Sequence, residues 1–153
     1  EIAADAKAKG SSFYKDLIDC YVAYGFYKEK LISLTKKGMD GAAEIKQMMI
    51  DFKENPVVAI DGSKVIIVDD YNTSTSKNIK TGEITKIDIP TSNVLIYTTE
   101  DGTRMAARPS GTEPKIKFYF SINSTLDKAE NYKKVNATLE AKIERILSEL
   151  KLN

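Results

Sequence analysis

The stretch "RPSGTEPKIKFYF", residues 108–120, carries the most structural information in the chain. Its first half places a proline at each end of a run of small hydroxyl and glycine residues, and the two prolines stiffen the backbone there. From residue 115 onward, apolar and polar side chains alternate through "KIKFYFSI", which is the period of a strand with one buried face. The stretch therefore predicts a rigid loop that runs directly into a strand of a half-buried sheet.

The loop has the composition of an anion-binding site. Small residues leave backbone N–H groups unobstructed, so such a loop can close around an anion. Arg108 ends the preceding strand and can donate two hydrogen bonds to a phosphate, and Lys117 lies on the polar face of the next strand. The candidate ligands are Arg108, Ser110, Gly111, Thr112 and Lys117. An ordinary turn bounded by proline and glycine is the alternative, and Glu113 opposes an anion unless it turns away to cap loop N–H groups.

Outward from this loop, period-two patterns predict an antiparallel sheet. The preceding "NVLIYTTEDGTRMAAR", residues 93–108, is typical of a hairpin about Asp101-Gly102. Because even offsets share a face of a strand, Arg104 and Arg108 are expected on the same side of the sheet. A further strand is expected at residues 27–34, and further hairpins at 57–70, about Asp61-Gly62, and at 78–89, about Thr81-Gly82.

Apolar spacing of three and four residues predicts the helices. They are expected at residues 1–9, 12–24 and 40–55, and from about Leu126 to the end of the chain. Asp40 is placed to cap the third helix, and Cys20 is expected to be a buried apolar residue of the second. Helices and antiparallel strands in this order predict an α+β fold, a sheet covered on one side by helices.

Composition excludes several classes of function. The chain has 153 residues and a formal net charge of +1, so no charged field favours nucleic acid or a membrane surface. One cysteine allows no internal disulfide, and a cytoplasmic setting is expected. There is no histidine, which removes the commonest general base and metal ligand. Asp69, Asp70 and Asp88 are too scattered for a metal cage and are expected at solvated strand ends.

The loop and its flanks resemble one enzyme family. "RPSGTEPKIKFYF" is similar to the phosphate-binding signature of the α-D-phosphohexomutases, and "TSNVLIYTTEDGTRMAA" is similar to the segment that precedes it. The resemblance covers residues 26–153, which correspond to the C-terminal, fourth domain. It is strongest to the phosphoglucomutase/phosphomannomutase and phosphopentomutase branch. The fold that it implies is the antiparallel sheet with helices of the TATA-box-binding protein.

The resemblance also implies a role for each part of the chain. Arg108 and the loop residues would hold the substrate phosphate that does not react, while the residues that do the chemistry lie in the other three domains. The parent would need Mg²⁺ and a bisphosphorylated sugar activator, and this chain would supply no catalytic or metal-binding residue and show no activity alone. Residues 1–25, which open "EIAADAKAKG" without an initiator methionine, would be the helical tail of the third domain.

Other readings of the sequence stay open at this point. One is a stand-alone, non-enzymatic module that binds phospho-ligands, against which the opening without methionine argues. Another is a phosphopentomutase or phosphoglucosamine mutase as the parent enzyme. A nucleic-acid binder is suggested by analogy of fold alone, and the near-neutral net charge argues against it.

Overall fold

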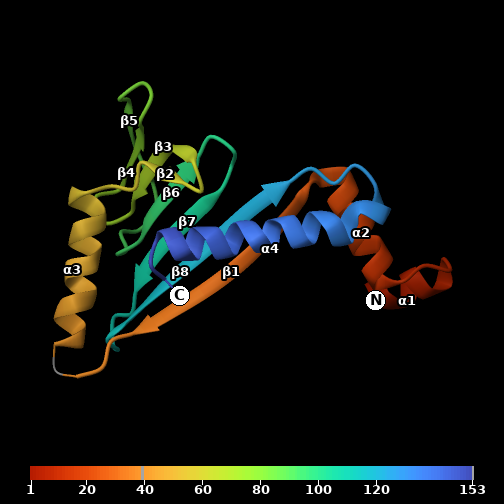
Figure 1. Cartoon of the computed structure of the whole chain (residues 1–153), viewed down its shortest axis with the longest axis horizontal. Helices are drawn as coiled ribbons and strands as arrows, with labels where there is room; N and C mark the ends of the chain where they lie inside the picture. Colours follow the sequence, from red (N-terminus) through yellow and green to blue (C-terminus); the bar gives the residue numbers. More distant parts are fainter. Residues whose placement is uncertain (39, 153) are drawn as a thin grey trace.

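An antiparallel sheet with helices on one face makes up most of the chain (Figure 1). The structure is a computed structural model that describes residues 1–38 and 40–152. The helices are α1 (Ile2–Ala8), α2 (Phe13–Tyr24), α3 (Gly41–Glu54), the 3-10 turn η1 (Ala129–Asn131) and α4 (Tyr132–Glu149). The strands are β1 (Phe26–Thr35), β2 (Ala59–Ile60), β3 (Ser63–Asp70), β4 (Thr75–Asn78), β5 (Ile84–Lys86), β6 (Leu95–Thr99), β7 (Arg104–Pro109) and β8 (Lys115–Ser124).

Every strand pair in this sheet is antiparallel. The order is β1-β8-β7-β6-β3-β4-β5, and β2 pairs with β3. The last strand of the chain therefore inserts between the first strand and the β6–β7 hairpin. The α+β prediction is confirmed, as are the hairpins about the three predicted Xaa-Gly turns.

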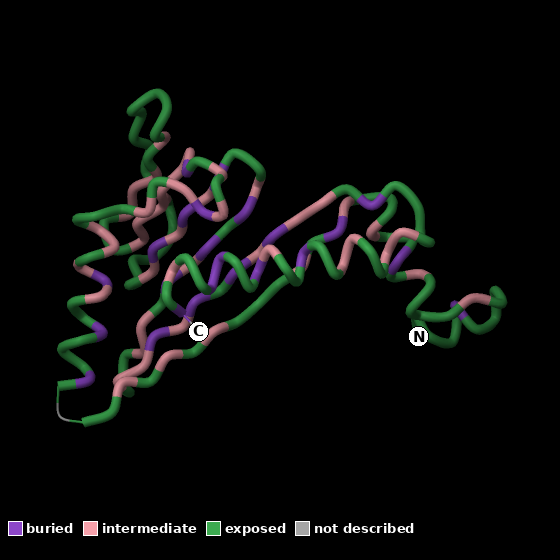
Figure 2. Tube along the Cα trace, viewed as in Figure 1, coloured by how far each residue is buried: buried purple, intermediate pink, exposed green. Residues whose placement is uncertain are grey.

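One face of the sheet holds the core. Along β8 the residues Ile116, Phe118, Phe120 and Ile122 are at most 2% exposed, and they alternate with less buried side chains. The helix α4 lies along β8 and β1 on this face, and α3 contacts β7 and β8 (Figures 1 and 2). The strand alternation predicted from residue 115 onward thus determines which side of the sheet the helices cover.

The opposite face of β1, β8, β7 and β6 lies away from α3 and α4. It carries the alternate residues of each strand, among them Leu31, Tyr119, Ala106 and Ile96, which the strand registers place side by side. Leu31 and Tyr119 are 49% and 38% exposed. This face is called the open face below.

Three details of the predicted helices differ in the structure. The long helix does not begin near Leu126: that side chain is buried in the connection from β8, and α4 starts only at Tyr132 after a 3-10 turn. Cys20 is exposed rather than buried. The reason is that α2 turns Ile18 and Tyr21 toward the domain, whereas Cys20 lies on the other side of the helix. Asp40 precedes α3 but makes no side-chain capping hydrogen bond.

The helix α2 connects the first two helices to the rest of the domain. α1 contacts α2, and Tyr21 of α2 stacks on Phe26 at the start of β1. Gly25, with a φ of 94°, ends α2 where the sheet begins. The outward side of α2 leaves Phe13 58% and Tyr24 81% exposed. The assignment of residues 1–25 to a preceding domain stays a prediction.

The helix α4 holds two Asp-Gly turns of the sheet. Lys142 donates to the carboxylate of Asp101 and, at 2.9 Å, to the Thr103 hydroxyl. One turn later along the helix, Arg145 donates two hydrogen bonds of 2.7 Å to the carboxylate of Asp61. Both hairpin tips are therefore fixed to the same helix by cations three residues apart.

The contact between Lys142 and Asp101 should make stability depend on pH. Burial raises the pKa of Asp101, but hydrogen bonds from Lys142, Thr99 and Thr103 outweigh it and hold that pKa well below its usual range. A carboxylate with a lowered pKa stabilises the fold above its unfolded pKa of about 4 and loses this contribution as the pH falls below it. We expect Lys142→Met to cost about 1–2 kcal/mol at pH 7 in urea unfolding.

The difference in stability between wild type and Lys142→Met should shrink as the pH is lowered from 5 toward 2. Lys134→Met, on an exposed turn of the same helix, serves as the control and should change the unfolding free energy by less than about 0.5 kcal/mol. An equal difference between wild type and Lys142→Met at pH 7 and pH 2 would contradict this account of Asp101.

Candidate anion-binding site

The loop between β7 and β8 borders a hollow of about 230 Å³. Four of the five predicted ligands line it. The lining residues are Arg108, Pro109, Ser110, Gly111, Glu113, Lys115 and Lys117. Thr112, the fifth predicted ligand, is not among them. The hollow therefore brings together Arg108 and Lys117, from the two strands, with Ser110 and Gly111 of the loop.

The two predicted cations are held side by side by the sheet. Arg108 of β7 lies directly opposite Lys117 of β8 in the antiparallel register. Like charges in directly opposite positions destabilise a sheet. Among the described residues neither side chain takes part in a salt bridge. A pair of neighbouring cations without a counter-ion is the arrangement that a bound dianion would stabilise.

A third cation lies at the hollow, and sequence reasoning missed it. Lys115 lines the opening, but its ammonium group contacts the carboxylate of Glu113 at 3.1 Å. Glu113 therefore does not turn to the loop N–H groups as the sequence allowed. It neutralises Lys115, so that the charge left for a ligand comes from Arg108 and Lys117. The alternation in "KIK" puts Lys115 and Lys117 on one face of the strand, so the sequence could have predicted that Lys115 also lies at the site.

Hydrogen bonds within the loop decide which donors stay available. The Ser110 hydroxyl accepts from the backbone N–H groups of Thr112 at 3.4 Å and Glu113 at 3.3 Å. The Ser110 N–H donates to the Lys115 carbonyl at 2.8 Å. In the described part of the chain the Gly111 N–H has no such partner. With two hydrogen bonds accepted, the Ser110 oxygen has its own O–H free to donate, together with the Gly111 N–H.

Gly111 has no structural reason to be glycine. Its φ is not in the left-handed region, and an added Cβ would meet no atom within 4 Å. The missing side chain instead leaves space above the loop backbone, which is the condition for a ligand to approach an N–H group closely. The loop is open on one side and carries positively charged side chains.

Other kinds of site find little support in the described residues. No group of three or more His, Cys, Asp or Glu side chains in the described ranges is close enough to hold a metal ion. Asp70 is engaged by Lys53 at 3.1 Å and by the N–H of Asn72. No described helix is long and apolar enough to span a bilayer.

Comparison with known proteins places this loop in a family. Residues 44–139 match the model described as "Phosphoglucomutase/phosphomannomutase, C-terminal domain". A phosphoglucomutase of Staphylococcus saprophyticus is 33% identical over 132 residues, which cover 86% of this chain and 23% of the relative. One from Staphylococcus aureus (strain MRSA252) is 35% identical over 137 residues, covering 90% and 24%. The chain spans about a quarter of the length of these relatives.

A solved structure from Paramecium, the open form of the phosphoprotein pp63/parafusin, a phosphoglucomutase, also aligns with the chain. It is 14% identical, with a TM-score of 0.42, and the match covers 95% of this chain and 26% of that one. At this level of similarity the match carries no argument.

Proposed function

We infer the function of this chain from the premise that it belongs to the phosphoglucomutase/phosphomannomutase C-terminal domain family. We propose that its loop binds the phosphate of a sugar phosphate that is not reacting, through Arg108, Lys117 and the donors of Ser110 and Gly111. Thr112 would act through its hydroxyl or by shaping the loop, since its N–H is held by Ser110. The observation that supports this most is the directly opposed pair of Arg108 and Lys117, neither of which forms a salt bridge with any described residue.

The reaction belongs to the longer protein of which this chain is proposed to be a domain. We propose that this parent moves a phosphoryl group between C1 and C6 of a hexose through a bisphosphorylated intermediate, in the cytoplasm. Mg²⁺ and the bisphosphorylated activator would be bound by its other domains, because the described residues offer no cluster of metal ligands. The chain on its own would bind substrate without converting it.

A phosphate site suits this reaction for a physical reason. Holding the distant phosphate supplies binding energy that positions the reacting end of the sugar. Because the intermediate has to turn around, the same loop has to accept either of its phosphates. A loop that offers positive charge and hydrogen-bond donors, and reads no other part of the sugar, meets both requirements.

An NMR titration tests this proposal. Inorganic phosphate added to the ¹⁵N-labelled chain should shift the amides of Ser110 and Gly111 with a dissociation constant of about 1 mM, which corresponds to about 4 kcal/mol of binding. The affinity should be this low because the site is exposed to water, where charge-assisted hydrogen bonds gain little. Sodium chloride at equal ionic strength is the control. Unmoved loop amides, or conversion of glucose 1-phosphate to glucose 6-phosphate by the chain, would contradict the proposal.

A further inference from the structure

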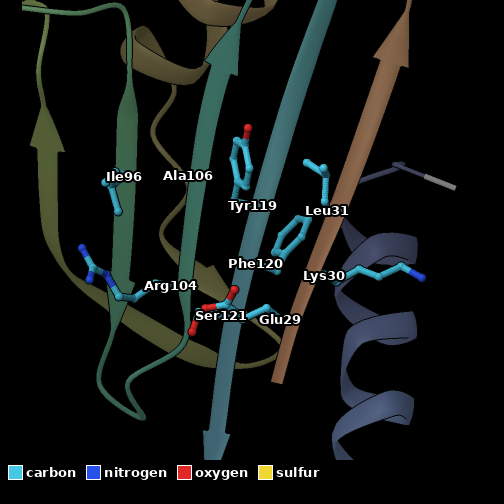
Figure 3. A pocket seen from close by; sticks show the side chains of 9 residues that line it. All are labelled: Glu29, Lys30, Leu31, Ile96, Arg104, Ala106, Tyr119, Phe120 and Ser121. Carbon is cyan, nitrogen blue, oxygen red and sulfur yellow. The ribbon is translucent and has the colours of Figure 1, made fainter. Parts of the chain in front are cut away.

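A large hollow lies on the open face, next to the loop proposed to bind phosphate. It has a volume of about 590 Å³ (Figure 3). Four adjacent strands line it. The lining residues are Glu29, Lys30, Leu31, Ile96, Arg104, Ala106, Tyr119, Phe120 and Ser121. Among them Tyr119 and Leu31 project from neighbouring strands onto this face, whereas Lys30 points away from it (Figure 3).

The strand register connects this hollow to the loop. Arg108 opposes Lys117, Ala106 opposes Tyr119, and Arg104 opposes Ser121. These three pairs follow one another at steps of two residues, so all lie on the open face and are about 7 Å apart. Tyr119 is therefore the first side chain of β8 on this face beyond the proposed phosphate ligand Lys117.

Tyr119 forms the centre of an apolar band on the open face. The registers place Leu31 on one side of it and Ala106 and then Ile96 on the other. In the described part of the chain Tyr119 packs against no other aromatic ring. Ala106 is small, so the space above it is open beside the tyrosine ring. The band therefore presents an exposed ring beside an apolar floor, with charged side chains next to it along the strands.

The next pair along the sheet is polar. Glu29 of β1 opposes Ser121, which opposes Arg104 of β7. Neither Glu29 nor Arg104 makes a salt bridge within the described residues. This row therefore offers a hydrogen-bond acceptor, a hydroxyl and a donor at the far edge of the band. Glu29 would repel a second phosphate, so this row suits neutral hydroxyl groups better than an anion.

We propose that the open face binds the ring of the sugar phosphate whose phosphate occupies the loop, with Tyr119 as the platform under the ring. The proposal rests on the proposed function of the loop. A hexose ring presents C–H groups that pack on an aromatic face and hydroxyls at its rim. A phosphate between Arg108 and Lys117 places the attached ring about one pair of residues away, over Tyr119 and Ala106. Its hydroxyls then face Arg104, Ser121 and Glu29.

The test compares two phosphate monoesters that differ in the ring. Glucose 6-phosphate and glycerol 3-phosphate are titrated into the chain, with its amides followed by NMR. The wild type should bind glucose 6-phosphate about fivefold more tightly, and only this ligand should shift the amides around Tyr119. Tyr119→Ala should remove that preference and leave glycerol 3-phosphate binding unchanged, whereas Tyr119→Phe should keep the preference because the ring remains.

Tyr27→Ala provides the matched control. Tyr27 is also an exposed tyrosine of the open face. On β1 it lies four residues before Leu31, which is the residue opposite Tyr119, and it is therefore farther from the loop. The preference for glucose 6-phosphate should survive in this variant. Equal binding of both esters by the wild type, or a preference unchanged in Tyr119→Ala, would overturn the inference and leave the phosphate site standing. If the wild type binds neither ester, the proposed function and this inference both fail.

Discussion

Replacing Phe118 by alanine should lower the free energy of unfolding by about 3–5 kcal/mol. The side chain is fully buried, on the helix-covered face of β8, the strand between β1 and β7. Its ring lies edge-on to Phe52 of α3 at 5.8 Å between centroids, and its neighbours in the register are Ile32 and Ala107. These groups can relax only partly into the space, because each belongs to a packed strand or helix. Urea unfolding followed by circular dichroism measures the effect.

The next residue provides the control. Tyr119→Ala removes a ring of similar size from the same strand, but from the open face, where it is 38% exposed. It should cost less than about 1.5 kcal/mol. If Phe118→Ala does not fold, Phe118→Leu should still cost more than Tyr119→Ala. Equal costs for removal of the two rings would mean that β8 is covered on both faces.

The sequence determined those parts of the fold that depend on local pattern. The alternation in "KIKFYFSI" predicts both β8 and its buried face, since a strand has a period of two. The Asp101-Gly102 turn likewise predicts the β6–β7 hairpin. The order of the strands was not accessible in this way. Insertion of β8 between β1 and β7 brings together residues far apart in the chain, and no local pattern encodes that pairing.

The errors have the same origin. An apolar residue on a helix was expected to face the core, yet α2 has two apolar sides and only one of them packs on the domain, which left Cys20 exposed. Leu126 is buried like a helical core residue, but a loop carries it. In both cases the local sequence indicated an apolar segment. Tertiary packing decided which side of α2 is buried, and that Leu126 is buried from a loop and not from a helix.

The candidate site was only partly predictable. Arg108, Ser110, Gly111 and Lys117 line one hollow as expected, because a short loop and an antiparallel pair keep their ends together. The position of Thr112 outside the lining could not be predicted, since it depends on which N–H groups the Ser110 hydroxyl accepts from. The phosphate-binding roles themselves stay predictions.

Arg108→Ala should weaken phosphate binding at least tenfold, to a dissociation constant above about 10 mM, which is a loss of about 1.4 kcal/mol or more. The guanidinium group is the one side chain at the hollow that can donate two parallel hydrogen bonds to a phosphate. Arg108→Lys should recover part of the affinity, because the charge returns without the fork. Lys64→Ala, in β3 and outside the loop, should leave binding unchanged. NMR titration with inorganic phosphate, as for the wild type, measures all three.

Arg108→Ala should not destabilise the fold, and this result would distinguish a ligand-binding role of Arg108 from a structural one. Arg108 stands opposite Lys117 without a salt bridge in the described chain, so removing it relieves a repulsion. At low salt we expect the unfolding free energy of Arg108→Ala to be the same as that of wild type or higher by a few tenths of a kcal/mol. At about 0.5 M salt this increase should disappear, because salt screens the repulsion that the substitution removes. Added phosphate should stabilise the wild type but not the variant. A variant that loses both binding and about 1 kcal/mol or more of stability would instead show that Arg108 holds the loop in shape.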